Sequence, residues 1–180
     1  PDAKKGVEER KKDRDKKLKE LNRIFDDAEA YLKARQAPGA GEPVAEDRRL
    51  EALLPVLRGE TPLLVEANDL PTIKSAVDWA EKRKLRIILR GGADAGRWAE
   101  ELAKRKIPVI LGETSNLPTR VDEPYDTSFT LPARLQAAGV QFCITANEDA
   151  SLIMNLQHQA GMAAAFGLDP KTALRAITLF

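Results

Sequence analysis

The chain has 180 residues, of which 43% are hydrophobic and 32% are charged, enough for one ordinary domain with a real core. Its 29 Lys and Arg residues against 28 Asp and Glu residues give a formal net charge of +1, so no overall field favours nucleic acid or an anionic membrane as a partner. A single histidine, His158, and a single cysteine, Cys143, exclude a disulfide framework and the multi-histidine zinc sites of many hydrolases.

No signal peptide and no apolar run of membrane-spanning length is present in the sequence. The first residue is not Met, and the last residue, Phe180, lies inside an apolar run. We therefore expect the sequence to be a piece of a longer protein, whose cellular address is not contained in it.

Residues 1–37 are expected to form a charged helical arm. Their apolar residues fall three or four positions apart, as on one stripe of a long solvated helix. These are Leu18, Leu21, Ile24, Phe25, Ala28, Tyr31 and Leu32. The first dozen residues lack the stripe and are expected to fray. The basic cluster at residues 10–12 could bind an acidic partner, but the acidic residues around it favour a solvated face.

Residues 38–60 are expected to be a linker followed by a short helix. Two prolines and two glycines between residues 38 and 43 break any regular structure. The helix is expected at 46–58, ended by Gly59, with Pro55 kinking it or ending it early.

From residue 61 to residue 180, apolar runs alternate with amphipathic segments. Strands are expected at 62–65, 87–89, 108–111 and 140–145, and helices at 70–84, 95–103, 128–138, 151–166 and from Pro170 onward. This order predicts an α/β fold of about four parallel βα units. A closed barrel of eight such units needs about 250 residues, so we expect half of a TIM-like barrel or a small open sheet.

An open four-stranded sheet would leave two edges with unpaired backbone groups. The partners expected to cover them are the remainder of a longer barrel, a second copy of the chain, or the N-terminal helix. The sequence gives no reason to expect nucleic acid or a membrane among the partners.

Polar side chains cluster where the four strands are expected to end. The candidates are Glu66, Asn68, Asp69, Arg90, Glu113, Thr114, Asn147, Glu148 and Asp149. At the carboxyl ends of adjacent parallel strands they would share one rim, where they could hold a hard cation or present Arg90 to an anionic group. The favoured alternative is that Arg90 pairs with Glu66 or Glu113 and neutralises the rim. Gly91-Gly92 is a weak phosphate-binding signal.

The order of these segments resembles the second half of the metal-dependent amidohydrolases, in particular the imidazolonepropionase-like group. The matching text is LLVEANDLPTIKSAVDWAEKRKLRIILRGGADAGRWAEELAKRKIPVILGE, then LQAAGVQFCITANEDAS, then GLDPKTALRAITLF. The resemblance covers residues 50–180. It implies hydrolysis of C–N bonds in amides or cyclic amides by a full-length protein that uses zinc, iron or manganese.

The resemblance fails at the places where the family carries its metal ligands. Glu66 and Asn68 stand where its fifth strand presents histidine, and Arg90 stands where its sixth strand does. Asn147 corresponds to the aspartate of its eighth strand, although a small shift would bring Glu148 or Asp149 to that place. Because arginine cannot coordinate a metal and asparagine cannot act as a general base, we expect no metal and no activity in this segment alone, and we assign no catalytic residue.

Two other hypotheses stay open. The full-length protein is an active amidohydrolase with a remodelled site, in which Glu66, Glu113 and Asp149 help to hold the metal and Arg90 binds a substrate carboxylate. Alternatively, the chain is a non-catalytic interaction or structural module, in which helix 14–36 packs against a partner or a second copy.

Overall fold

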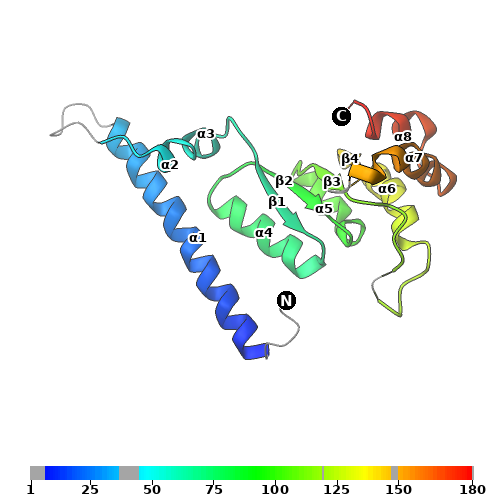
Figure 1. The fold of residues 1–180 in the computed structure, drawn as a ribbon, viewed down its shortest axis with the longest axis horizontal. Helices are drawn as coiled ribbons and strands as arrows, with labels where there is room; N and C mark the ends of the chain where they lie inside the picture. The colour runs from blue at the N-terminus through cyan, green and yellow to red at the C-terminus, as the bar shows by residue number, and fades with distance from the viewer. Residues whose placement is uncertain (1–6, 37–44, 119, 147–149, 180) are drawn as a thin grey trace. The chain divides into compact units, whose positions relative to one another are not determined.

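The computed structural model describes residues 7–36, 45–118, 120–146 and 150–179. The chain forms two compact units, Pro1–Thr61 and Pro62–Phe180, and each is described by itself (Figure 1). None of the described helices combines the length and the apolar composition that crossing a membrane requires.

The first unit consists of a long helix and two short ones. Helix α1 spans Val7–Gln36, α2 spans Arg48–Glu51 and α3 spans Leu54–Leu57. Helices α2 and α3 lie beside the C-terminal end of α1 (Figure 1). Phe25, Ala28 and Tyr31 are buried there, and the Tyr31 hydroxyl donates a hydrogen bond of 2.7 Å to Glu51 Oε1.

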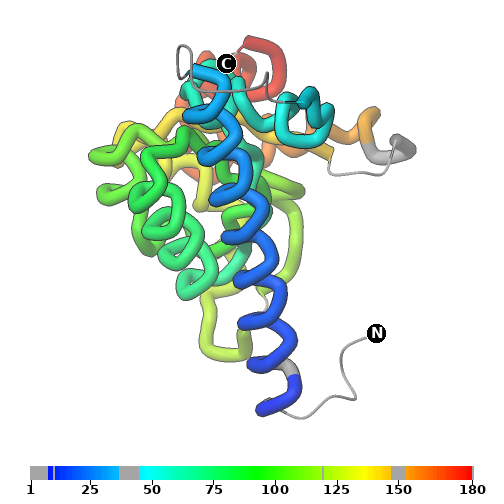
Figure 2. Tube along the Cα trace, turned by 90° about the vertical axis from the view of Figure 1, so that its left-hand side faces the viewer, coloured from blue at the N-terminus to red at the C-terminus, as the bar shows by residue number. Residues whose placement is uncertain are grey.

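The N-terminal half of the predicted apolar stripe is not covered in the same way, since Leu18, Leu21 and Ile24 are exposed. The structure is helical from Val7 onward, which includes the second half of the dozen residues expected to fray (Figure 2). Glu8 and Glu9 occupy its first turn, where negative charge stabilises the positive end of the helix dipole. Residues 1–6 lie outside the described part of the chain.

The short helix expected at 46–58 is divided at Ala52-Leu53. Pro55 is the reason, because it has no N–H to donate to the carbonyl of Glu51 four residues earlier. Asp47 caps α2 by accepting from the Arg49 N–H at 2.9 Å. Gly59 ends α3 with a φ of 73°, a conformation that glycine adopts without strain.

The second unit is built on a four-stranded parallel sheet. Strands β1 (Leu63–Ala67), β2 (Ile87–Gly91), β3 (Val109–Leu111) and β4 (Phe142–Ile144) pair in the order β1-β2-β3-β4. The predicted fold class, α/β with four parallel strands after an N-terminal helix, is confirmed. Two strand ends differ from the prediction, because β1 and β2 continue through Glu66 and Arg90 rather than stopping before them.

Helices follow the strands in the predicted order. They are α4 (Leu70–Lys82), η2 (Ala95–Arg97), α5 (Ala99–Lys104), α6 (Thr127–Ala138), η3 (Ala150–Asn155), α7 (Leu156–Ala165) and α8 (Pro170–Ala176). The helix expected at 95–103 is divided at Trp98, whose φ of −137° is not helical. The last helix begins at Pro170 as predicted, and Asp169 caps it by accepting from the Thr172 N–H at 2.8 Å.

One face of the sheet carries the core of this unit. Side chains alternate along the strands, and the buried set comprises Ile87, Leu89, Val109, Leu111, Phe142 and Ile144. On the other face Leu64 is 52% exposed, and Ile88, Ile110 and Cys143 are half-buried. We call these four residues the open sheet face. Cys143 is only half-buried because its side chain belongs to this less covered face.

Asp69 caps α4 and provides a test of how this helix begins. Its carboxylate accepts from the Thr72 N–H at 2.9 Å and from the Thr72 hydroxyl at 2.7 Å, and these bonds lower the pKa of Asp69. Asp69→Ala is expected to lower the free energy of unfolding by about 1 kcal/mol, whereas Asp69→Asn keeps the cap and changes it by a few tenths. Urea denaturation followed by tryptophan fluorescence measures both, because Trp79 and Trp98 lie in the second unit. Equal losses in the two variants would contradict a capping role.

Candidate functional site

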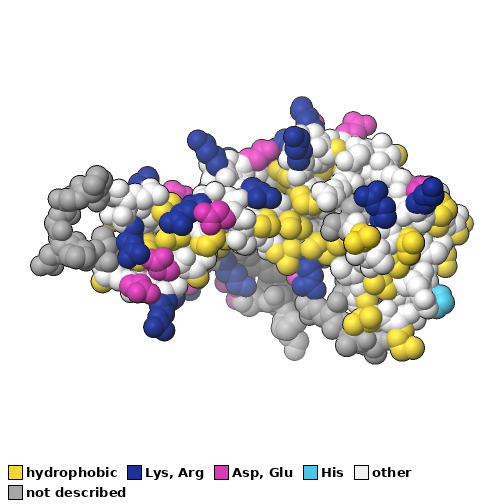
Figure 3. Space-filling model, turned by 90° about the horizontal axis from the view of Figure 1, so that it is seen from above, with side chains coloured by type: hydrophobic (Ala, Val, Ile, Leu, Met, Phe, Trp, Pro, Cys, Tyr) yellow, Lys and Arg dark blue, Asp and Glu magenta, His cyan; other side chains and the backbone are white. Residues whose placement is uncertain are grey.

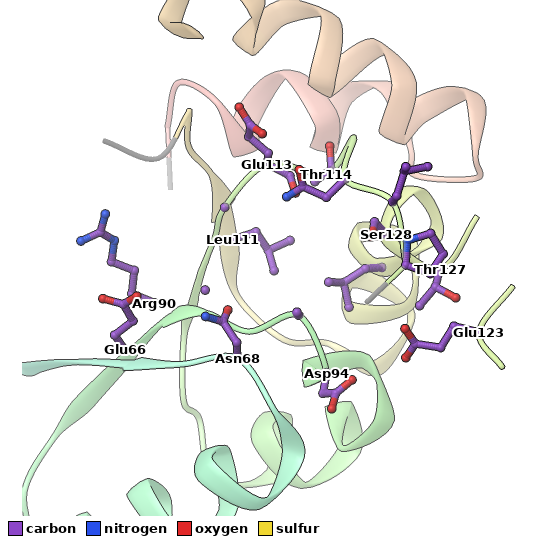
Figure 4. A pocket seen from close by; sticks show the side chains of 17 residues that line it. Glu66, Asn68, Arg90, Asp94, Leu111, Glu113, Thr114, Glu123, Thr127 and Ser128 are labelled. Carbon is purple, nitrogen blue, oxygen red and sulfur yellow. The ribbon is translucent and has the colours of Figure 1, made fainter. Parts of the chain in front are cut away.

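The carboxyl ends of β1, β2 and β3 surround a cavity of about 660 Å³. Five rim residues predicted from the sequence line it: Glu66, Asn68, Arg90, Glu113 and Thr114 (Figure 4). The loop after β3 and the first turns of α6 form another wall, with Glu123, Thr127, Ser128 and Leu131. We call this cavity the rim cavity.

Of the predicted rim residues, Thr114 also contacts α7, and the remaining one in the described part of the chain does not line the rim cavity. Asp69 caps α4. The backbone N–H of Thr114 donates to Oε1 of the buried Gln159 at 3.3 Å, and its buried hydroxyl has no hydrogen-bond partner in the described part of the chain. Asn147, Glu148 and Asp149 lie outside the described residues. His158 is exposed on the surface of α7 (Figure 3), as expected for a histidine without a role in the rim.

Glu66 and Arg90 are direct neighbours in the sheet. Their Cα atoms are partners in the register of β1 and β2, and both side chains point to the same side of the sheet (Figure 4). Opposite charges in directly facing positions on adjacent strands attract each other. Arg90 is half-buried and Glu66 is exposed, so water screens part of this attraction.

The turn after β2 requires both of its glycines. Gly91 and Gly92 have φ values of 94° and 66°, a region that side chains with a Cβ rarely adopt. A Cβ on Gly91 would lie 2.3 Å from Asn68 Oδ1, and one on Gly92 would lie 2.9 Å from Val109 Cγ1. The glycines therefore allow the Asn68 amide to lie over the backbone of β2.

The same turn does not favour a phosphate group. The N–H of Gly92 donates to the Ala67 carbonyl at 2.8 Å, and the N–H of Asp94 donates to the Asn68 carbonyl at 2.9 Å, so two of its amides are already used. The buried carboxylate of Asp94 follows directly, and it offers an anion no hydrogen-bond donor.

A cluster that the sequence analysis missed lies at the other side of the rim cavity. Asp94 is 7% exposed, and its carboxylate accepts two hydrogen bonds from the Arg120 guanidinium, at 3.1 and 2.5 Å. Arg120 also contacts the Glu123 carboxylate. The bonds from Arg120 hold the pKa of Asp94 below its usual value, and the two carboxylates raise the pKa of Arg120.

The cluster has only a faint signal in the sequence. Asp94 and Arg120 are 26 positions apart and belong to no recognisable motif. The available hint is an aspartate among the small residues of the Gly91–Gly96 turn, together with an arginine in a loop bounded by Pro118 and Pro124.

Comparisons with known proteins give one similar structure. No protein-family model matches the sequence, and no curated protein matches it. The crystal structure of an amidohydrolase from Thermotoga maritima MSB8 has a TM-score of 0.75 and 22% sequence identity, over 88% of this chain and 42% of that one. This chain thus spans less than half of the length of that protein. At this identity the likeness shows a shared fold.

The described part of the rim contains no ready-made set of metal ligands. Divalent metals that activate water are held by imidazoles and carboxylates, and among the described residues no group of three His, Cys, Asp or Glu side chains lies close enough to hold one. Asn68 offers only a neutral oxygen. The Arg90 guanidinium has no lone pair to donate to a metal and repels a cation.

Proposed function

We propose that this chain is the C-terminal half of an amidohydrolase-like barrel that has lost the metal ligands of that family and does not catalyse hydrolysis alone. The single observation that carries the proposal is the place of Arg90. It lines the rim cavity at the carboxyl end of β2, directly beside Glu66. In the imidazolonepropionase-like enzymes that the sequence resembles, these places present histidines to the metal.

The half-barrel part of the proposal is supported by the sheet. A parallel sheet is normally covered on both faces, yet Leu64 on the open sheet face is 52% exposed. A closed barrel turns that face inward and fills it with side chains from all of its strands. The likeness to 42% of the Thermotoga maritima protein agrees with a second half that completes the barrel.

The chemistry left to the rim is binding. Among the described residues that line the rim cavity, Arg90 is the only Lys or Arg, and guanidinium groups bind carboxylates with paired hydrogen bonds. Glu66 and Glu113 line the same cavity, so a ligand that carries both a carboxylate and a cationic group matches its charges. In this proposal the chain holds a ligand or shapes the barrel, and activates no water.

The same cavity also favours a second candidate function, that of an active amidohydrolase with a remodelled site. Such an enzyme would use Arg90 to bind the carboxylate of an acidic amide. In that case Arg90→Ala in the full-length protein raises KM for acidic amides by about two orders of magnitude, with a smaller change for neutral ones. An unchanged KM rejects this candidate.

The loss of metal ligands is tested by restoring them. Zinc affinity, measured by calorimetry, is expected to be weak in the natural chain and about tenfold or more stronger in the Glu66→His/Arg90→His variant. The matched control, Glu66→Gln/Arg90→Gln, removes the same charges without adding ligands and is expected to resemble the natural chain. Stoichiometric zinc, iron or manganese in the natural protein, lost in Glu66→Gln, would overturn the proposal.

Light scattering tests whether a second copy of the chain covers the open sheet face. Without its second half, the chain is expected to self-associate through this face. Leu64→Lys should then lower the measured mass, whereas Leu174→Lys, which changes a residue of α8 that is 62% exposed, should not. A mass that falls only when residues 1–37 are deleted would assign the contact to the helical arm instead.

A further inference from the structure

We propose that Asp94 and Arg120 are positioning residues that clamp residues 120–128 in place as the outer wall of the rim cavity. This inference holds whether or not the rim binds a metal, because neither residue is one of the candidate ligands.

Asp94 connects two of the segments that form the rim. Its backbone N–H donates to the Asn68 carbonyl at 2.9 Å, and its Oδ2 accepts from the Leu70 N–H at 3.1 Å. The residue therefore holds the β1–α4 loop, which carries Asn68, against the turn after β2. Because Asp94 is buried, its carboxylate depends on these partners rather than on water.

Arg120 attaches the third segment to the same carboxylate. The two hydrogen bonds of 3.1 and 2.5 Å form a bidentate pair, which fixes direction as well as distance. Three positions further on, the Glu123 carboxylate contacts the same guanidinium and lines the rim cavity. Asp94 and Glu123 stand on one side of the cavity, opposite Glu66 and Arg90 (Figure 4).

Hydrophobic burial contributes little to holding this wall. Val121 and Tyr125 are exposed, and the backbone bonds within the segment, from the N–H of Glu123 to the Arg120 carbonyl and from that of Thr127 to the Pro124 carbonyl, are local turns. The clamp is therefore the contact that holds residues 120–126, which lead into Thr127 and Ser128 at the start of α6, a helix anchored by the buried Leu131 and Leu135.

Other charged groups around Asp94 define the control. Arg97 lies 4.0 Å from Oδ2 of the same carboxylate and belongs to η2 rather than to the loop, so it partly neutralises Asp94 from a different segment. The negative charge of Asp69 is also felt by Asp94 across the cap of α4. Arg97→Gln thus removes one positive charge from Asp94, as Arg120→Gln does, and leaves the wall attached.

Hydrogen–deuterium exchange of the whole chain tests the proposal. Asp94→Asn and Arg120→Gln are each expected to raise exchange in residues 120–128 by about tenfold or more, while residues 85–91 of the sheet stay protected. The double variant should raise exchange by less than the product of the two single effects, because both substitutions remove the Asp94–Arg120 contact. The Arg120–Glu123 contact and the bond from the Leu70 N–H are each affected by only one of the two substitutions. Arg97→Gln should match the natural chain.

A pH profile separates the clamp from a general packing role. The ratio of the exchange rates of Arg120→Gln and the natural chain cancels the intrinsic pH dependence of exchange, and it should fall to one when Asp94 is protonated. Four outcomes would each overturn the proposal. They are unchanged exchange in Arg120→Gln, single effects that multiply in the double variant, an Arg97→Gln effect equal to that of Arg120→Gln, and a ratio of exchange rates that does not depend on pH. If Asp94→Asn also raises exchange in residues 85–91 of the sheet, the comparison of Arg120→Gln with its control Arg97→Gln decides the outcome, because the Arg120 side chain is partly exposed and its loss disturbs the core less.

Discussion

Leu89→Ala is expected to lower the free energy of unfolding of the second unit by about 3 to 4 kcal/mol. Leu89 is fully buried at the centre of β2, where it faces Val65 on one side and Val109 on the other. Removing its side chain loses the transfer free energy of three carbons and leaves a hole that two paired strands cannot collapse to fill. Urea denaturation followed by the fluorescence of Trp79 and Trp98 measures the loss.

Leu64→Ala is the matched control, since it makes the same change in the same sheet at a residue that is 52% exposed in the single chain. At protein concentrations low enough to keep the chain monomeric, it is expected to cost less than about 1 kcal/mol. If Leu64→Ala costs as much as Leu89→Ala in the isolated chain, the open sheet face is covered in solution, and a self-associated form is the first explanation to examine.

Asp94→Ala is expected to lower the free energy of unfolding by about 2 to 3 kcal/mol at pH 7. It removes the acceptor of two bonds from Arg120 and one from the Leu70 N–H, and it leaves that N–H without its partner. The estimate lies below the cost of breaking a fully buried ion pair because water reaches the Arg120 side of the contact.

At acid pH, the natural chain and Asp94→Ala should have nearly the same free energy of unfolding. Because the pKa of Asp94 is lowered in the folded chain, its contribution is fully present above the ordinary carboxyl pKa of about 4 and is lost as pH falls through the lower folded value. Urea midpoints of the natural chain and of Asp94→Ala are therefore expected to approach each other between pH 5 and pH 2, as a rough guide. The control is Asp122→Ala, which removes an exposed carboxylate from the same loop. A difference in urea midpoint between the natural chain and Asp94→Ala that stays constant with pH contradicts the role given to the Asp94 carboxylate.

The sequence predicted the strands because each one is a short apolar run bounded by turn residues. It did not predict where β1 and β2 end. Glu66 and Arg90 are polar, and their side chains suggested that the strands had stopped, but strand pairing is a property of the backbone and continues wherever a neighbour is in register. The gap between the prediction and the structure is therefore largest where side-chain polarity and backbone pairing disagree.

The open sheet face was hidden for a different reason. Ile88 and Ile110 made the strands look apolar on both sides, which is typical of a fully covered parallel sheet. A local pattern shows that a face is suited to burial, and it carries no information on which segment buries it. That information lies in contacts between distant parts of a fold.

The rim was predicted in part by a topological rule. Glu66, Asn68, Arg90 and Glu113 follow from the tendency of adjacent parallel strands to end at one edge, and all four line the rim cavity. Asp94 and Arg120 do not follow from it, because a clamp between a turn and a long loop depends on how the loop folds back. No periodicity or motif encodes that path.

The strand order has a consequence for how the chain acquires its structure. Each strand pairs with the next one along the chain, so every pairing closes a segment of only about 20 to 35 residues. Each pairing therefore has a smaller loop-closure entropy to overcome than pairing between strands more distant in the chain would have. During synthesis the sheet can grow one unit at a time from β1 toward β4, and at each stage the newest strand serves as the template for the one that follows it.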